Sequence, residues 1–190
     1  MMAERVAIPD LRLKKPVVMV GMMGAGKTAV GRAVAGHLHV PFLDSDHEIE
    51  TAANMTIAEI FARDGEPFFR VKEAQVIARL LAGPPMVLST GGGAFMQEDN
   101  RALVARLGVS VWLKADLDTL WARVKQKATR PLLRTADPYG TLAGLVEARD
   151  PTYALADVTV RSETGFSIDQ TARRVIDALK ARPDVLETPE

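Results

Sequence analysis

The sequence contains no cysteine among its 190 residues. This absence excludes disulfide bonds, thiolate catalysis and metal sites built from cysteine, and it fits the reducing cytoplasm in which we expect the protein to act. Net charge is absent as well, because 24 acidic residues balance 24 basic ones. A neutral chain has no field that gathers nucleic acid, and no run of Lys and Arg is interleaved with aromatic residues. The composition therefore disfavours a nucleic-acid partner.

Long apolar runs are also missing from the chain. No stretch reaches the roughly 18 residues of a membrane-spanning helix, and residues 1–15 hold no apolar signal core, so we expect no membrane partner. The length suits one domain that buries a central sheet and its helices. We expect this single domain to span residues 1–190 as a monomer, with its core at about 16–182. The polar or proline-bearing ends, 1–15 and 183–190, are expected to be frayed and flexible.

Residues 21–28, Gly-Met-Met-Gly-Ala-Gly-Lys-Thr, form a complete G-x-x-x-x-G-K-[ST] motif directly after the apolar run 17–20. The glycines let the backbone direct N–H groups at phosphate oxygens, Lys27 adds a charge for the β/γ-phosphates, and the Thr28 hydroxyl is placed to bind Mg²⁺. Apolar residues at 30, 34 and 38 predict a helix whose N-terminus faces the anion. A chance match would not bring the correct strand and helix with it. The predicted nucleotide-binding residues are Gly24, Ala25, Gly26, Lys27, Thr28 and Ala29.

Short apolar runs alternate with helical patterns along the rest of the chain, which is typical of βαβ units. Strands are expected at about 16–20, 40–43, 86–89, 109–113 and 158–160. Helices are expected at 28–38, after the capping box of Thr56 and Glu59, at 66–81, after Asp99 as its cap and up to Gly108, at 116–127, at 142–153, and after Ser167. Right-handed crossovers then give a three-layer α/β/α fold around a five-stranded parallel sheet.

Ligands of an open parallel sheet gather at the carboxyl ends of its strands. Asp44 and Asp46, the run Gly91–Gly93 and a loop of residues 128–140 are all expected at this edge, beside the phosphate loop. The aspartates could face Mg²⁺ and an acceptor hydroxyl, or an aspartate could simply cap the next helix. The three glycines could form a flexible turn, although the entropy cost of ordering them favours a close backbone approach to a ligand.

Taken together, these residues resemble shikimate kinase in order and spacing over about residues 16–180. The motifs that carry the resemblance are the phosphate loop, Asp44-x-Asp46, Phe61 with Asp64-Gly65-Glu66-x-x-Phe69-Arg70, Gly91-Gly92-Gly93, Arg130-Pro131-Leu132-Leu133, and Arg149 with Tyr153. The resemblance implies a P-loop fold like that of nucleoside monophosphate kinases, with strand order 2-3-1-4-5. It also implies transfer of the γ-phosphoryl group of ATP to the 3-hydroxyl of shikimate, a step of aromatic amino-acid biosynthesis.

The resemblance further implies roles on the acceptor side of the site. Asp46 would hold and deprotonate the attacking hydroxyl. Arg70 and Arg149 would clamp the shikimate carboxylate, since a planar guanidinium offers two parallel donors, although Arg70 could instead be a solvated helix residue. The remaining substrate residues are Gly91, Gly92 and Gly93, as backbone donors, and Phe61 and Phe69, which either wall the ring or belong to the core.

On the nucleotide side, the resemblance implies Mg²⁺ as cofactor and ATP as co-substrate. Asp44 would reach Mg²⁺ through water. Arg130, in a lid at about 128–140, would join Lys27 in stabilising the transferred phosphoryl group. Arg123 would grip the adenine, although residues 162–167 depart from the proline-containing segment usual in this family.

Two other classes of protein share some of these features. A gluconate-type or nucleotide-type kinase has the phosphate loop and lid, but it should lack the D-G-E-x-x-F-R helix together with the glycine run. A GTPase-like switch would need an N-K-x-D element, which this sequence does not contain.

Overall fold

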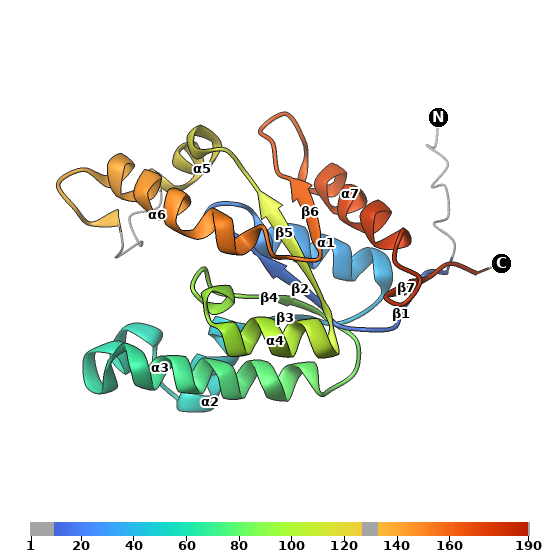
Figure 1. The fold of residues 1–190 in the computed structure, drawn as a ribbon, viewed down its shortest axis with the longest axis horizontal. Coiled ribbons are helices and arrows are strands. Elements are labelled where there is room, and N and C mark those ends of the chain that lie inside the picture. The colour runs from blue at the N-terminus through green and yellow to red at the C-terminus, as the bar shows by residue number, and fades with distance from the viewer. Residues whose placement is uncertain (1–9, 127–132, 190) are drawn as a thin grey trace.

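The structure is a computed structural model that describes residues 10–126 and 133–189. Its centre is a five-stranded parallel sheet with the order β3-β4-β2-β5-β6 (Figure 1). The strands are β2 (Val17–Val20), β3 (Phe42–Asp44), β4 (Val87–Ser89), β5 (Val109–Lys114) and β6 (Val158–Arg161). Counted within this sheet by their order in the chain, the strands run 2-3-1-4-5, so the predicted topology is confirmed.

Helices cover both faces of this sheet. They are α1 (Lys27–Leu38), α2 (Ser45–Ala53), α3 (Ile57–Leu81), α4 (Glu98–Leu107), α5 (Leu117–Val124), α6 (Pro138–Tyr153) and α7 (Ile168–Lys180), with a 3₁₀ turn, η1, at Ala94–Met96. The crossover through α1 and the crossover through α4 run in opposite directions across the sheet. Because such crossovers are right-handed, these two helices lie on opposite faces. Figure 1 shows α7 beside α1 and α3 beside α4, which gives the three predicted layers.

The core lies on both sides of β2, the middle strand. Val17, Val18 and Met19 have no exposed surface, which explains why this strand is a continuous apolar run rather than an alternating one. Val34 of α1 and Val175 of α7 are fully buried where the two helices pack together. Among the described residues, no helix is long and apolar enough to cross a membrane.

The beginnings of the helices partly follow the sequence signals. Thr56 and Glu59 form the expected capping box, in which the Thr56 N–H donates to the Glu59 carboxylate at 2.7 Å. Helix α3 is interrupted at Gly65, whose backbone is not helical (φ 82°, ψ 172°), so its two segments correspond to the short helix and the long helix that we expected separately. The prediction that Asp99 caps α4 is wrong. Gln97 occupies the N-cap position and makes no side-chain hydrogen bond there, which places Asp99 within the first turn.

The expected lid is shorter at its C-terminal end than the sequence suggested. Helix α6 begins at Pro138 rather than near residue 142, because the Asp137 side chain caps it and proline is well suited to the first turn. Residues 138–140 are therefore helical. Arg130 and its neighbours, residues 127–132, lie outside the described residues.

The prediction that both chain ends are frayed is wrong for the described parts of them. Strand β1 (Arg12–Leu13) pairs antiparallel with β7 (Leu186–Glu187), and the Lys14 N–H donates to the Val185 carbonyl at 2.8 Å. Leu186 and Val185 are buried, at 1% and 0% exposure. A few apolar side chains are enough to dock each end on the core, even though both segments are polar on average.

Candidate active site

The phosphate loop occupies the connection from β2 to α1. Gly21, Gly24 and Gly26 have φ values of 142°, 83° and 97°, in a region that side chains rarely adopt. A Cβ at Gly24 would also lie 2.7 Å from a methyl group of Val124 on α5. The motif glycines are therefore needed both for the backbone turn and for the close packing of α5 against the loop.

A cavity of about 650 Å³ opens beside this loop. Among the predicted nucleotide residues, Gly24, Gly26, Lys27, Thr28, Ala29 and Arg123 line it, together with Asp44 and Asp46. The Lys27 ammonium donates to the carbonyls of Gly21 and Met22 at 2.7 and 3.0 Å. The positive end of α1 and the Lys27 side chain thus stand at one wall of the cavity, while two carboxylates stand at another.

The two aspartates of the D-x-D motif have different surroundings. Asp44 ends β3 and caps α2, since its Oδ1 accepts the N–H groups of Asp46 and His47 at 2.9 and 3.2 Å. Burial and the charges of Asp44 and Glu73, opposed by that of Lys27, together raise the pKa of Asp46 to about 6. A carboxyl group with a pKa near neutrality suits a general base. The structure therefore supports a capping role for Asp44 and is compatible with a chemical role for Asp46.

The glycine run follows β4 and is approached closely by three charged side chains. A Cβ at Gly91 would lie 2.9 Å from the Asp46 carboxylate, and a Cβ at Gly92 would lie 3.0 Å from Nη1 of Arg149. The third residue, Gly93, faces the guanidinium of Arg70 even more closely. The glycines thus leave room for the predicted base and both predicted clamp arginines, which the fold brings together from three different helices.

Arg70 is held by two acids on its own helix. Its Nη1 donates to Glu73 at 2.8 Å, while its Nε and Nη2 approach Glu66 at 3.4 and 3.3 Å. Burial raises the pKa of Glu73, which is only 1% exposed, and the hydrogen bond and charge of Arg70 oppose that rise. The sequence reasoning missed Glu73, although its spacing three residues after Arg70 on one helix was a usable signal.

Arg149 lies one turn before Tyr153 on α6. Tyr153 is fully buried, and its hydroxyl donates to the Gly92 carbonyl at 2.5 Å. Burial raises the pKa of Tyr153 to about 12, against the positive charge of Arg149, so the hydroxyl stays protonated and remains a donor. Its ring is stacked with Trp112 at a centroid distance of 6.0 Å. Tyr153 therefore fixes both the glycine turn and the end of the helix that carries Arg149.

The two phenylalanines predicted as walls occupy different positions. Phe69 is buried, at 4% exposure, in a small apolar cluster with Ile49 and Ile60. Phe61 is 37% exposed and lies 4.8 Å from Phe69 between ring centroids. The guanidinium of Arg70 lies over the Phe69 ring at 5.2 Å. Phe69 thus supports the Arg70 side chain from the core side, and the more exposed Phe61 lies next to it.

Arg123 connects the phosphate loop to the strand β6 region. Its Nη1 donates to the carbonyls of Gly24 and Ala25 and to the Ser162 hydroxyl, at 3.0, 3.2 and 3.0 Å. Ser162 in turn donates to the Ala25 carbonyl at 2.9 Å and is buried. The sequence singled out residues 162–167 only as a departure from the family pattern. The structure shows that Ser162, the first residue of this segment, is hydrogen-bonded to the phosphate loop.

Known proteins similar to this chain identify its family. A family model described as Shikimate kinase matches residues 23–180. The chain belongs to the shikimate kinase family. The shikimate kinase of Cereibacter sphaeroides is 71% identical over 179 residues, which cover 94% of this chain and 89% of that protein. The shikimate kinase of Ruegeria pomeroyi is 67% identical and covers 92% of this chain and 90% of its own length.

Solved structures agree with this assignment. The fold is similar to that of a shikimate kinase from Acinetobacter baumannii solved in complex with shikimate, with a TM-score of 0.82, 36% identity, and coverage of 88% of this chain and 93% of that one. A gluconokinase from Sinorhizobium meliloti, at a TM-score of 0.61 and 19% identity, covers 90% of this chain and 94% of its own and shares the fold alone. The prediction of a shikimate kinase is therefore confirmed. The protein is an ATP-dependent kinase of the shikimate pathway.

Proposed function

We propose that this shikimate kinase transfers the γ-phosphoryl group of ATP to the 3-hydroxyl of shikimate in the cleft between the phosphate loop and the glycine run. One observation carries the assignment to this cleft. Asp46, Arg149 and Arg70 each approach a successive glycine of Gly91–Gly93, beside the cavity that Lys27 lines. A base and two guanidinium groups on one small turn suit an acceptor with both a hydroxyl and a carboxylate.

ATP would occupy the cavity of about 650 Å³. Backbone N–H groups of residues 24–29 and the N-terminus of α1 would receive the phosphates, and Lys27 would exchange its carbonyl partners for phosphate oxygens. Arg123 already lies at the junction of the loop and Ser162, where it can form one side of the adenine site.

We also propose that Arg130 closes over the phosphates. Slower proteolysis at Arg130 or Arg134 in the presence of an ATP analogue and shikimate would support this closure.

Mg²⁺ fits the oxygen donors at the edge of this cavity. The Thr28 hydroxyl and the Asp44 carboxylate both line it, and hard oxygen ligands of this kind, completed by water and phosphate, are what Mg²⁺ prefers. The described residues contain no cluster of three or more histidine and acidic side chains that could hold a metal alone. When bound, Mg²⁺ would neutralise phosphate charge and orient the transferred group.

The acceptor would be held by its two ends. Arg70, fixed by Glu73, and Arg149 would bind the carboxylate with charge-assisted bonds, and Phe61 and Phe69 would lie beside the ring. At the other end, Asp46 would accept the proton of the attacking hydroxyl.

Turnover measured with different acceptors tests the proposed function. With Mg²⁺-ATP, we expect ADP release in proportion to added shikimate at a kcat of about 1–100 s⁻¹, the usual range of kinases. Gluconate and nucleoside monophosphates are the matched alternatives. ADP release that depends on one of them and not on shikimate, from folded protein, would overturn the assignment.

We also propose that the enzyme acts in the cytoplasm as a monomer. Light scattering at assay concentration measures its mass and tests the monomer.

A further inference from the structure

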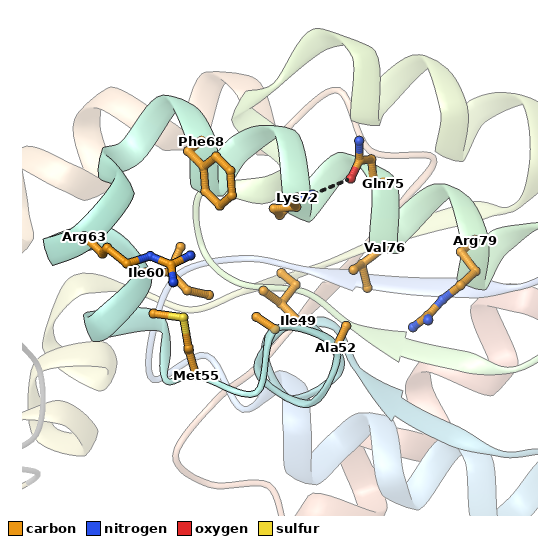
Figure 2. Close-up of a pocket in the computed structure, with 11 residues that line it drawn as sticks. Ile49, Ala52, Met55, Ile60, Arg63, Phe68, Lys72, Gln75, Val76 and Arg79 are labelled. Carbon is orange, nitrogen blue, oxygen red and sulfur yellow. Dashed lines mark hydrogen bonds between the residues drawn. The ribbon is translucent and has the colours of Figure 1, made fainter.

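A second cavity, of about 420 Å³, lies between α2 and α3 (Figure 2). It shares no lining residue with the cavity beside the phosphate loop. Its floor is apolar, because Ile49, Ile60 and Val76 are buried there at 1%, 1% and 9% exposure. Met55 and the half-exposed ring of Phe68 extend this apolar surface toward solvent. The volume lies within the range of ordinary small-molecule sites.

The rim of this cavity is basic and contains no acidic residue. Arg63, Lys72 and Arg79 all line it, and Figure 2 shows Arg63 and Arg79 near its two ends with Lys72 between them. The two arginines are partly neutralised, by Asp64 at 2.8 Å and by Glu48 at 3.4 Å.

Lys72 is the cation with the least compensated charge. It makes no ion pair with any described residue; its ammonium contacts the Gln75 side chain at 3.4 Å and lies 5.4 Å from the centre of the Phe68 ring. A lysine above an apolar cavity and next to an aromatic ring offers a place for one carboxylate whose apolar part enters the cavity. An ammonium group on the same ligand would find no acidic partner among the residues that line the cavity.

The position of this cavity connects it with the active site. Helix α2 carries Asp46 in its first turn, and α3 carries Arg70, so the two helices that enclose the cavity also hold the proposed base and one arm of the proposed clamp. A ligand wedged between these helices would move the base and the clamp relative to each other.

We propose that the cavity between α2 and α3 is an effector site for a small aromatic carboxylate, and that its occupation weakens binding of the acceptor. The aromatic part suits Phe68 and Met55, which favour ring stacking and sulfur–ring contacts. The kinetic part of the proposal, the effect on acceptor binding, rests on the proposed acceptor site, whereas binding of the carboxylate to the cavity does not.

Calorimetry with phenylpropionate, first without shikimate and then at saturating shikimate, tests the binding. Because the coupling is reciprocal, shikimate should weaken this binding by the same factor by which phenylpropionate weakens shikimate binding, without abolishing it. We expect binding that phenylpropylamine, of the same size and opposite charge, does not reproduce. Lys72→Gln should weaken it roughly threefold to fivefold, as the loss of one exposed charge pair would. Ala52→Phe should abolish it, because Ala52 is an exposed residue of the cavity wall whose replacement fills the space without altering the core. Lys180→Gln, on the distant helix α7, is the matched control and should change nothing.

Two results would overturn the proposal. Phenylpropionate that is displaced by shikimate and binds equally to the Lys72→Gln protein would occupy the carboxylate clamp instead. Absence of binding to the wild-type protein at millimolar concentrations would remove the site altogether. For the kinetic part, phenylpropionate should raise the shikimate KM at least twofold in the wild-type enzyme and leave it unchanged in Ala52→Phe. An equal rise in both enzymes would refute the effector role and leave the proposed function intact.

Discussion

Replacing Gly93 by alanine would test whether Arg70 binds the acceptor, without touching any charged group. The backbone of Gly93 has φ −93° and ψ −10°, which alanine adopts without strain. The new Cβ would, however, lie only 2.8 Å from Nη1 of Arg70 and closer still to its Nη2. The guanidinium is the end of a flexible side chain and can shift, but a shift moves it away from its present place beside the turn and strains its hydrogen bonds to Glu73 and Glu66. The clamp must therefore lose its geometry.

The size of the effect follows from the bonds that this geometry supports. A hydrogen bond between charged partners contributes about 1.5–3 kcal/mol, and about 1.4 kcal/mol is a factor of ten in an equilibrium constant. We expect the shikimate KM of Gly93→Ala to rise roughly tenfold to a hundredfold, with little change in the ATP KM. Steady-state kinetics with each substrate varied in turn measures the two values separately.

Gly144→Ala provides the matched control. Gly144 lies within α6, and a Cβ there would meet no atom within 4 Å. This variant should keep both KM values and gain about 0.5–1 kcal/mol of stability, because alanine favours the helix. If Gly93→Ala is folded by circular dichroism and binds shikimate as well as the control does, Arg70 does not depend on this turn, and our account of the clamp fails.

Three further changes address other parts of the site. Lys27→Ala should weaken ATP binding and abolish turnover, as titration with a nucleotide analogue and an ADP assay would show. Arg149→Lys should raise the shikimate KM about tenfold despite the retained charge, because lysine lacks the planar fork; an unchanged KM would remove Arg149 from the clamp. Asp46→Asn should abolish turnover but raise the melting temperature at neutral pH. The folded pKa of about 6 exceeds the ordinary aspartate value of 3.8, so ionised Asp46 destabilises the fold by about 1–3 kcal/mol once the pH rises through this window. The gain should disappear below pH 4, and wild-type kcat/KM for shikimate should fall as the pH drops through about 6.

Local sequence signals were sufficient for the phosphate loop and for the positions of the strands along the chain, whereas the order of the strands in the sheet was implied by the resemblance to a family. The motif at residues 21–28 is contiguous, and its glycines need the φ values that the structure gives them. Short apolar runs marked the five strands because both faces of this sheet are covered. These features depend on neighbours in the chain, which a sequence displays directly.

Contacts between distant residues could not be derived in the same way. Ser162 meets Ala25 across 137 positions, and β1 pairs with β7 through residues near opposite ends of the chain. Gly93 looked like part of a ligand-binding turn, but nothing local indicates that Arg70 fills the space its missing side chain leaves. Such pairings depend on how the elements pack together. The resemblance to a family placed Gly93 and Arg70 in one site beforehand, but nothing placed Ser162 beside Ala25 or β1 beside β7.

The register of the sheet sets the spacing between the two halves of the site. Ser89, the last residue of β4, pairs with Asp44 of β3 on one side and with Met19 of β2 on the other. Adjacent strands lie about 4.8 Å apart, so the D-x-D segment and the phosphate loop start about 10 Å apart, with the glycine run between them. Thr90 fixes this arrangement, because its hydroxyl donates to the Met19 carbonyl at 2.9 Å just beyond the ladder. Since the sheet holds this edge rigidly, any closure around the substrates would have to come from elements outside the sheet, such as α2 with α3.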